Sequence, residues 1–177
     1  MSWSRRAFLL TCLPAALALS GCGFHPLYGK DQNRASTVPD LASIKIDTIA
    51  DRTGQLVQSA LLDRLTPKGR PAKPKYFLQV TLSEAKQGLG ILKDETASRS
   101  NYVLTANFSL ADKEGRSLYN SAASSQASFN ILSEHYASTA SERDARDRTA
   151  VEIADAITAQ LAAYFSRARD PQGKAKP

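Results

Sequence analysis

Residues 102–110, Tyr-Val-Leu-Thr-Ala-Asn-Phe-Ser-Leu, decide the fold, because apolar and polar side chains alternate strictly along them. Successive side chains of a β-strand point to opposite faces of a sheet, so the pattern predicts a strand with one buried face. The turn sequence DKEG follows at residues 112–115, and residues 117–130 are expected to return as an antiparallel strand. This β-hairpin is the centre from which the rest of the fold is built.

The chain on both sides of the hairpin supplies two more strands and two helices. Residues 76–82 alternate in the same way, and residues 44–46 form a shorter alternating stretch. Between them, apolar residues at helical spacing predict an amphipathic helix that is capped by Thr53 and stopped by Pro67. A capping-box sequence at residues 141–144 is expected to open the longest helix. We predict an α+β two-layer sandwich, in which two amphipathic helices cover one face of a four-stranded, mostly antiparallel sheet in the order β-α-β-β-β-α.

Two stretches of this sheet have uncertain roles. Residues 87–100 are polar around a few apolar positions and contain Gly88 and Gly90, so they are interpreted as a strand end that runs into a mobile connection. Residues 121–128 of the last strand are almost all Ser and Ala. Such small side chains fit either an edge strand beneath a helix or a surface that lies against the wall of another protein. The sequence leaves both interpretations open.

The N-terminus has the pattern of a bacterial lipoprotein signal peptide. Arg5 and Arg6 precede an apolar run at residues 7–19, and Leu-Ser-Gly-Cys at residues 19–22 resembles a lipoprotein cleavage site. The run is too short to span a hydrocarbon core of about 30 Å. Only the thiol of Cys22 can carry a thioether-linked diacylglycerol, so we predict lipidation at Cys22. Residues 4–10 also resemble a twin-arginine export signal, and the export route stays open.

These features divide the chain into a signal peptide at 1–21, a lipidated tether at 22–40, an α+β domain at 41–167 and a disordered basic tail at 168–177. The net charge of the full chain is +6, and the loss of Arg5 and Arg6 lowers it to +4. The excess is concentrated at residues 68–75 and 167–176. Nucleic acid is an unexpected partner for an exported protein, whereas phosphorylated lipids and lipopolysaccharide are available polyanions.

The residues offer no catalytic constellation. The two histidines, His25 and His135, have no metal-ligand spacing, and Cys22, which acylation would consume, is the only cysteine outside the leader. Neither a G-x-S-x-G elbow nor a Gly-rich phosphate loop is present. We therefore expect a protein that is not an enzyme and that has no cofactor and no metal site.

Several motifs resemble one known family. CGFHPLYG at residues 22–29, ASRSNY at 97–102, FNIL at 129–132, YAS at 136–138 and ERDAR at 142–146 are similar, in this order, to the alphaproteobacterial form of the LPS-assembly lipoprotein family, LptE. The resemblance implies a membrane-anchored plug inside a large outer-membrane β-barrel, the lipopolysaccharide translocon. Such a plug assists barrel assembly and binds lipopolysaccharide on its way to the outer leaflet.

The resemblance also implies a location and a binding site. Gly23 follows Cys22, where an Asp would favour the inner membrane, so we expect a lipid anchor on the periplasmic side of the outer membrane. Lys93 and Arg99 are the candidates for binding lipid A phosphates. The vicinity of Thr139 holds no cation, which puts a contribution from the loop expected before the last helix in doubt. The alternative function is an auxiliary lipoprotein of a periplasmic phospholipid transport complex.

Overall fold

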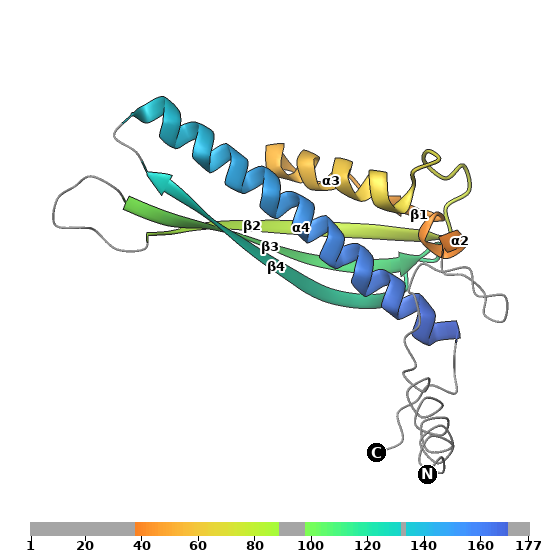
Figure 1. Cartoon of the computed structure of the whole chain (residues 1–177). Coiled ribbons are helices and arrows are strands. Elements are labelled where there is room, and N and C mark those ends of the chain that lie inside the picture. The colour runs from red at the N-terminus through yellow and green to blue at the C-terminus, as the bar shows by residue number, and fades with distance from the viewer. Residues whose placement is uncertain (1–37, 89–97, 132–133, 170–177) are drawn as a thin grey trace, which may run out of the picture.

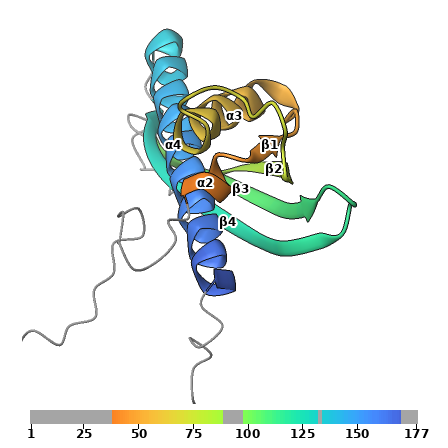
Figure 2. The same cartoon turned by 90° about the vertical axis from the view of Figure 1, so that its right-hand side faces the viewer.

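The computed structural model describes residues 38–88, 98–131 and 134–169, which form an elongated two-layer domain (Figure 1). The elements are α2 Val38–Leu41, β1 Ile44–Ile46, α3 Asp51–Leu65, β2 Tyr76–Gly88, β3 Ser98–Asp112, β4 Ser117–Ile131 and α4 His135–Arg169. Helices α3 and α4 lie on the same face of the sheet, as the view turned by 90° also shows (Figure 2). The predicted α+β sandwich and its element order are confirmed.

The sheet has the order β1-β2-β3-β4. Strand β1 pairs with β2 in parallel, because α3 carries the chain back between them, and the other two pairs are antiparallel. The sheet is therefore mixed but mostly antiparallel, as predicted. In the long central pairings Leu78 lies opposite Leu110, and Tyr102 lies opposite Ala127.

Strands β2 and β3 reach further than the sequence pattern suggests. The pairing continues to Gly88 opposite Ser100, and the Ser100 hydroxyl donates to the Gln87 carbonyl at 3.0 Å. The polar stretch therefore begins as the end of a strand, as predicted, and β3 already starts within it, at Ser98. Backbone groups pair without regard to side-chain polarity, so a polar strand end carries no alternating signal.

Two helix starts differ from the prediction. Helix α4 begins at His135 rather than at Ser141, so the proposed capping box lies inside the helix. Its first buried residue is Ala145, and without a buried face the first turns carry no apolar period. Helix α3 is preceded by Ala50, which makes no side-chain cap, and Thr53 is buried within the helix. The short helix α2 was not predicted.

The apolar core lies between the two helices and the sheet. Its largest fully buried apolar side chains come from β1, α3, β2, β3 and α4, namely Ile44, Val57, Leu61, Leu65, Leu78, Tyr102, Leu104, Leu110, Ile153, Ile157 and Leu161. Each such side chain contributes about 1.5–3 kcal/mol when it leaves water. No helix in the described ranges is both long enough and apolar enough to cross a bilayer.

Charged side chains close the seam between α4 and the sheet. The Lys86 ammonium lies 2.7 Å from the Glu142 carboxylate, and the Arg146 guanidinium lies 3.0 Å from Glu142 and 3.9 Å from Glu84. Arg146 also sits 5.5 Å from the ring centre of Tyr102. Burial lowers the pKa of Arg146, but Tyr102 and the two carboxylates outweigh it and raise that pKa overall. Both cations of the seam are therefore neutralised locally.

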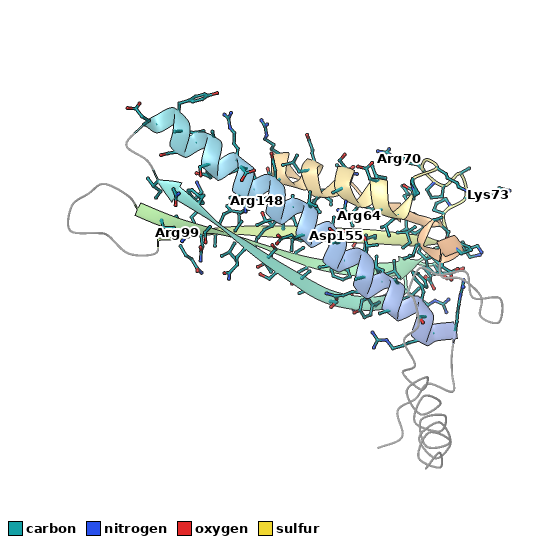
Figure 3. The ribbon with its side chains drawn as sticks, in the orientation of Figure 1. Arg64, Arg70, Lys73, Arg99, Arg148 and Asp155 are labelled. Atoms are coloured by element: carbon teal, nitrogen blue, oxygen red, sulfur yellow. The ribbon has the colours of Figure 1, made fainter. Side chains whose placement is uncertain are left out.

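A second polar contact ties the two helices together. Arg64 of α3 donates to both carboxylate oxygens of Asp155 on α4, at 2.5 and 3.0 Å (Figure 3). The hydrogen bonds from Arg64 hold the pKa of Asp155 below its usual value. The Asp155 side chain is 62% exposed, so solvent screens the pair. The pair therefore contributes little to the stability of the domain.

Gly54 is required where the chain turns from β1 into α3. A Cβ atom at this position would lie 2.8 Å from Cγ2 of Ile49 and 2.9 Å from the Ile49 carbonyl group. We predict that Gly54→Ala lowers the free energy of unfolding by about 1–3 kcal/mol, because the added methyl overpacks a buried turn. Gly88→Ala is the matched control, since a Cβ there meets nothing within 4 Å. Equal stability of the two variants in urea denaturation would contradict this account of the turn.

Tyr102 carries a buried hydroxyl that lies near Glu84, Thr53 and Arg146 but makes no hydrogen bond of standard geometry with a described residue. We predict that Tyr102→Phe preserves stability or raises it by up to about 1 kcal/mol, because it removes an unsatisfied polar group. Burial raises the pKa of Tyr102 above that of an unfolded tyrosine, so the free energy of unfolding of the wild type falls as the pH rises beyond about 10. Phenylalanine does not ionise, so the free energy of unfolding of the variant should fall less over the same pH range. A fall of several kcal/mol in urea denaturation at neutral pH would show that the hydroxyl is bonded.

Candidate functional site

The face of the sheet opposite the helices is polar, and its charged side chains stand at its margins, with Lys45 on β1 and Arg99 at the start of β3. Residues on this face alternate with core residues along β2, β3 and β4. The strand register places residues of neighbouring strands side by side on it, so that Ser109 lies between Gln79 and Asn120. The central positions are Gln79, Thr81, Ser83, Ala85, Gln87, Asn101, Val103, Thr105, Asn107, Ser109, Asn120, Ala122, Ser124, Gln126 and Ser128. We call this set the open face. It contains amides, hydroxyls and small apolar groups, and none of its members carries a charge.

Neighbouring side chains of the open face bind one another across the strands. The hydroxyls of Thr105 and Ser124 lie 3.2 Å apart, and the Ser128 hydroxyl donates to the Asn101 amide oxygen at 2.7 Å. A shallow hollow lies between the strands, and its lining includes Gln79, Asn107 and Asn120. The face therefore presents short, partly satisfied hydrogen-bonding groups instead of long charged side chains.

The small residues of β4 divide between the two faces of the sheet. On the covered face, Ala123 and Ala127 are 7% exposed, and the Ser121 hydroxyl donates to the side-chain oxygen of Gln160 on α4 at 2.6 Å. These residues allow α4 to lie close to an edge strand, which is one of the two interpretations left open by the sequence. Ala122 and Ser124 belong to the open face, where the second interpretation still applies.

Arg99 lies at one end of the domain. It is exposed at the start of β3, opposite Asn130 in the strand register, and it projects far from α2 (Figure 3). The exposed apolar residues Ile131 and Tyr136 are 43% and 84% exposed. Arg99 forms no ion pair with a described residue, unlike Lys86 and Arg146 of the seam.

The other two predicted site residues, Lys93 and Cys22, lie outside the described ranges. Thr139, expected in a loop, lies inside α4, where its hydroxyl donates to the His135 carbonyl at 2.9 Å. Sequence reasoning missed the uncharged positions of the open face, although the polar positions of the alternating strands could have identified them.

No group of three metal-ligating side chains occurs among the residues that the structure describes. The shifted pKa values belong to ion pairs and to fully or partly buried tyrosines, as with Asp155, Arg146 and Tyr102. What the geometry offers is a long hydrogen-bonding surface on a twisted sheet and an exposed cation, Arg99, at one end of it (Figure 1). Both are features of binding.

Solved structures of other lipoproteins share this fold. A putative lipoprotein from Caulobacter crescentus is 19% identical, with 73% of this chain and 96% of that chain covered at a TM-score of 0.61. A minor lipoprotein from Acinetobacter baumannii is 18% identical, with 69% and 91% covered at a TM-score of 0.57. At these identities the likeness establishes the fold alone. No curated protein sequence matches the chain.

The family comparison reaches further than the structural one. The LptE family, described as lipopolysaccharide-assembly, matches residues 41–161. That range spans β1 to most of α4, and so includes the whole sheet, both covering helices and the open face. The motifs that suggested the family from sequence lie partly within it, at the start of β3 and along α4. This chain belongs to the LptE lipopolysaccharide-assembly family.

Proposed function

We propose that this protein is a non-catalytic lipoprotein of the outer membrane, held on its periplasmic side by acyl chains on Cys22. It plugs a large β-barrel lipopolysaccharide translocon, helps that barrel to assemble, and binds lipopolysaccharide during insertion into the outer leaflet. Membership of the family supports the role in lipopolysaccharide assembly. The plug, the anchor and the ligand are the finer parts of the proposal.

The open face is the observation that carries the plug. Covering a charged side chain with protein costs several kcal/mol unless a partner neutralises it, whereas amides and hydroxyls need only replacement hydrogen bonds. The strands β2, β3 and β4 contribute 13, 15 and 15 residues, so the surface with uncharged central positions is long. It suits close contact with the polar inner wall of a barrel.

Ligand binding is assigned to the end of the domain where β3 begins. Lipid A carries phosphates, and guanidinium groups bind phosphate through paired hydrogen bonds. Arg99 is exposed at this end, and the exposed apolar side chains Ile131 and Tyr136 offer contact area for acyl chains. Lys93 joins the proposal from the sequence alone.

The direct test of the plug is purification from membranes in mild detergent. The full-length protein should co-purify with a large, heat-modifiable β-barrel protein in equimolar amount. Recovery of the protein alone from intact outer membranes, under conditions that preserve other barrel complexes, would contradict the proposal.

A charge placed on the open face should weaken this complex. Asn107 is exposed near the centre of that face, and we predict that Asn107→Arg reduces the co-purified barrel protein at least tenfold, because the guanidinium would be buried without a counter-charge. Ser59→Arg is the control, since Ser59 is exposed on α3, away from the open face. Both variants should keep the wild-type melting temperature. Undiminished barrel recovery with Asn107→Arg would exclude the open face from the contact.

Loss of the candidate cations should weaken lipopolysaccharide binding. We predict that Lys93→Ala with Arg99→Ala lowers affinity for lipopolysaccharide about tenfold or more, since each charge-assisted bond contributes about 1.5–3 kcal/mol. Arg148→Ala is the control, because Arg148 is an exposed cation on the outer side of the helical layer (Figure 3). Affinity can be measured by fluorescence titration of purified protein, with circular dichroism as the check on folding. An equal loss in the control would indicate a non-specific effect of charge.

A further inference from the structure

The chain carries a second cationic surface that the proposed function does not use. The segment between α3 and β2, residues 66–75, contains Lys68, Arg70, Lys73 and Lys75 and no carboxylate. All four cations are exposed, and none forms an ion pair within the described part of the chain. We call residues 66–75 the basic loop.

Prolines and backbone hydrogen bonds restrain the basic loop. Pro67, Pro71 and Pro74 fix the backbone angle φ at three positions, so the loop loses less conformational entropy when it binds. At its start, Thr66 donates to the Leu62 carbonyl at 2.9 Å through its backbone N–H. The cations are thus displayed on a preorganised segment rather than on a free tail.

The basic loop sits at the end of the domain where the chain arrives from its N-terminal part. The backbone N–H of Lys75 donates to the Ser43 carbonyl at 3.0 Å, and Ser43 in turn bonds to the carbonyl of Asp40 in α2 at 2.7 Å through its hydroxyl. Asp40 pairs with Arg169 at the end of α4. The first described residues, the basic loop and the last turn of α4 therefore meet at one corner, opposite Arg99 (Figure 3).

This corner lies close in sequence to the proposed lipid anchor. Fifteen residues lie between Cys22 and Val38, the first residue of α2. A chain of that length reaches at most about 55 Å, so the acyl chains on Cys22 hold this corner within that distance of the membrane surface. A lysine or arginine near an anionic bilayer gains roughly 1 kcal/mol, and lipid anchors are commonly reinforced by such a second signal.

We infer that the basic loop rests on the anionic phospholipid headgroups of the leaflet in which the protein is anchored. Lys68, Arg70, Lys73 and Lys75 contact the headgroup phosphates, and the acyl chains hold the loop in reach of them. The inference goes beyond the proposed function and takes from it only the anchor at Cys22. It also orients the domain, with the basic loop at the membrane surface and Arg99 directed away from it.

The test uses the chain from residue 22 to residue 177 with Cys22→Ala, so that no acyl chain masks the contribution of the loop. Binding is measured by co-sedimentation with phosphatidylcholine vesicles that contain or lack phosphatidylglycerol. We expect binding only to the anionic vesicles, and its loss at high salt, because ions screen exposed charges. Equal binding to both kinds of vesicle would overturn the inference.

Two double variants with the same loss of charge locate the contact. Arg70→Gln with Lys73→Gln should lower affinity for the anionic vesicles roughly tenfold or more, from the loss of about two surface contacts. Arg52→Gln with Arg143→Gln removes two exposed cations elsewhere and should change affinity less than twofold. An equal loss in both variants would overturn the inference, because it would indicate a response to total charge.

Two further measurements separate this inference from neighbouring ones. The Arg70/Lys73 variant should retain wild-type affinity for lipopolysaccharide; a loss of lipopolysaccharide affinity with unchanged vesicle binding would assign the loop to the ligand site and overturn the inference. In the lipidated full-length protein the same variant should still co-purify with the barrel. Failure to find a barrel with the wild-type protein would count against the proposed function while leaving the vesicle result intact.

Discussion

The packing of α4 against the covered face of β3 and β4 is the contact on which the rest of the structure depends. Ile153, Ile157 and Leu161 of α4 are fully buried in the core that also contains Leu104 and Leu110 of β3. Because this helix covers one face of the long hairpin, the polar groups of the strands are left on the other. The small residues of β4 follow from the same constraint, since a bulky edge strand would push the helix away. Packing on one side thus determines the chemistry of the opposite side.

Much of this arrangement could be predicted from the sequence, because it depends on periodicity. Strict alternation at residues 102–110 gave the central strand, and the apolar stripe from Ala150 to Phe165 gave the body of the last helix. The errors lie where no buried face imposes a period. The first turns of α4 from His135 have no buried residue before Ala145, and the polar ends of β2 and β3 pair through backbone groups, which leave no pattern in the side chains.

The candidate sites could be predicted less well than the fold, because a charged side chain can bind a ligand only if no other side chain of the protein neutralises it. Arg99 was chosen by resemblance, and the structure leaves it exposed and unpaired within its described surroundings. Lys86 and Arg146 have the same charge and lie on neighbouring elements, but carboxylates neutralise them. The sequence cannot distinguish these cases, since the partners come from strands and helices far apart along the chain. The uncharged open face could have been found by comparing the two alternating sets of each strand.

The length of the domain has a mechanical consequence. Helix α4 has 35 residues and spans about 52 Å, and the paired strands beside it run nearly as far. This exceeds the roughly 30 Å thickness of a bilayer's hydrocarbon core. A domain of such length, stiffened by a continuous hydrophobic core, transmits a change of position from one end to the other. If one end of the domain is held at a leaflet, the rigid length of the domain determines how far from that leaflet the other end lies.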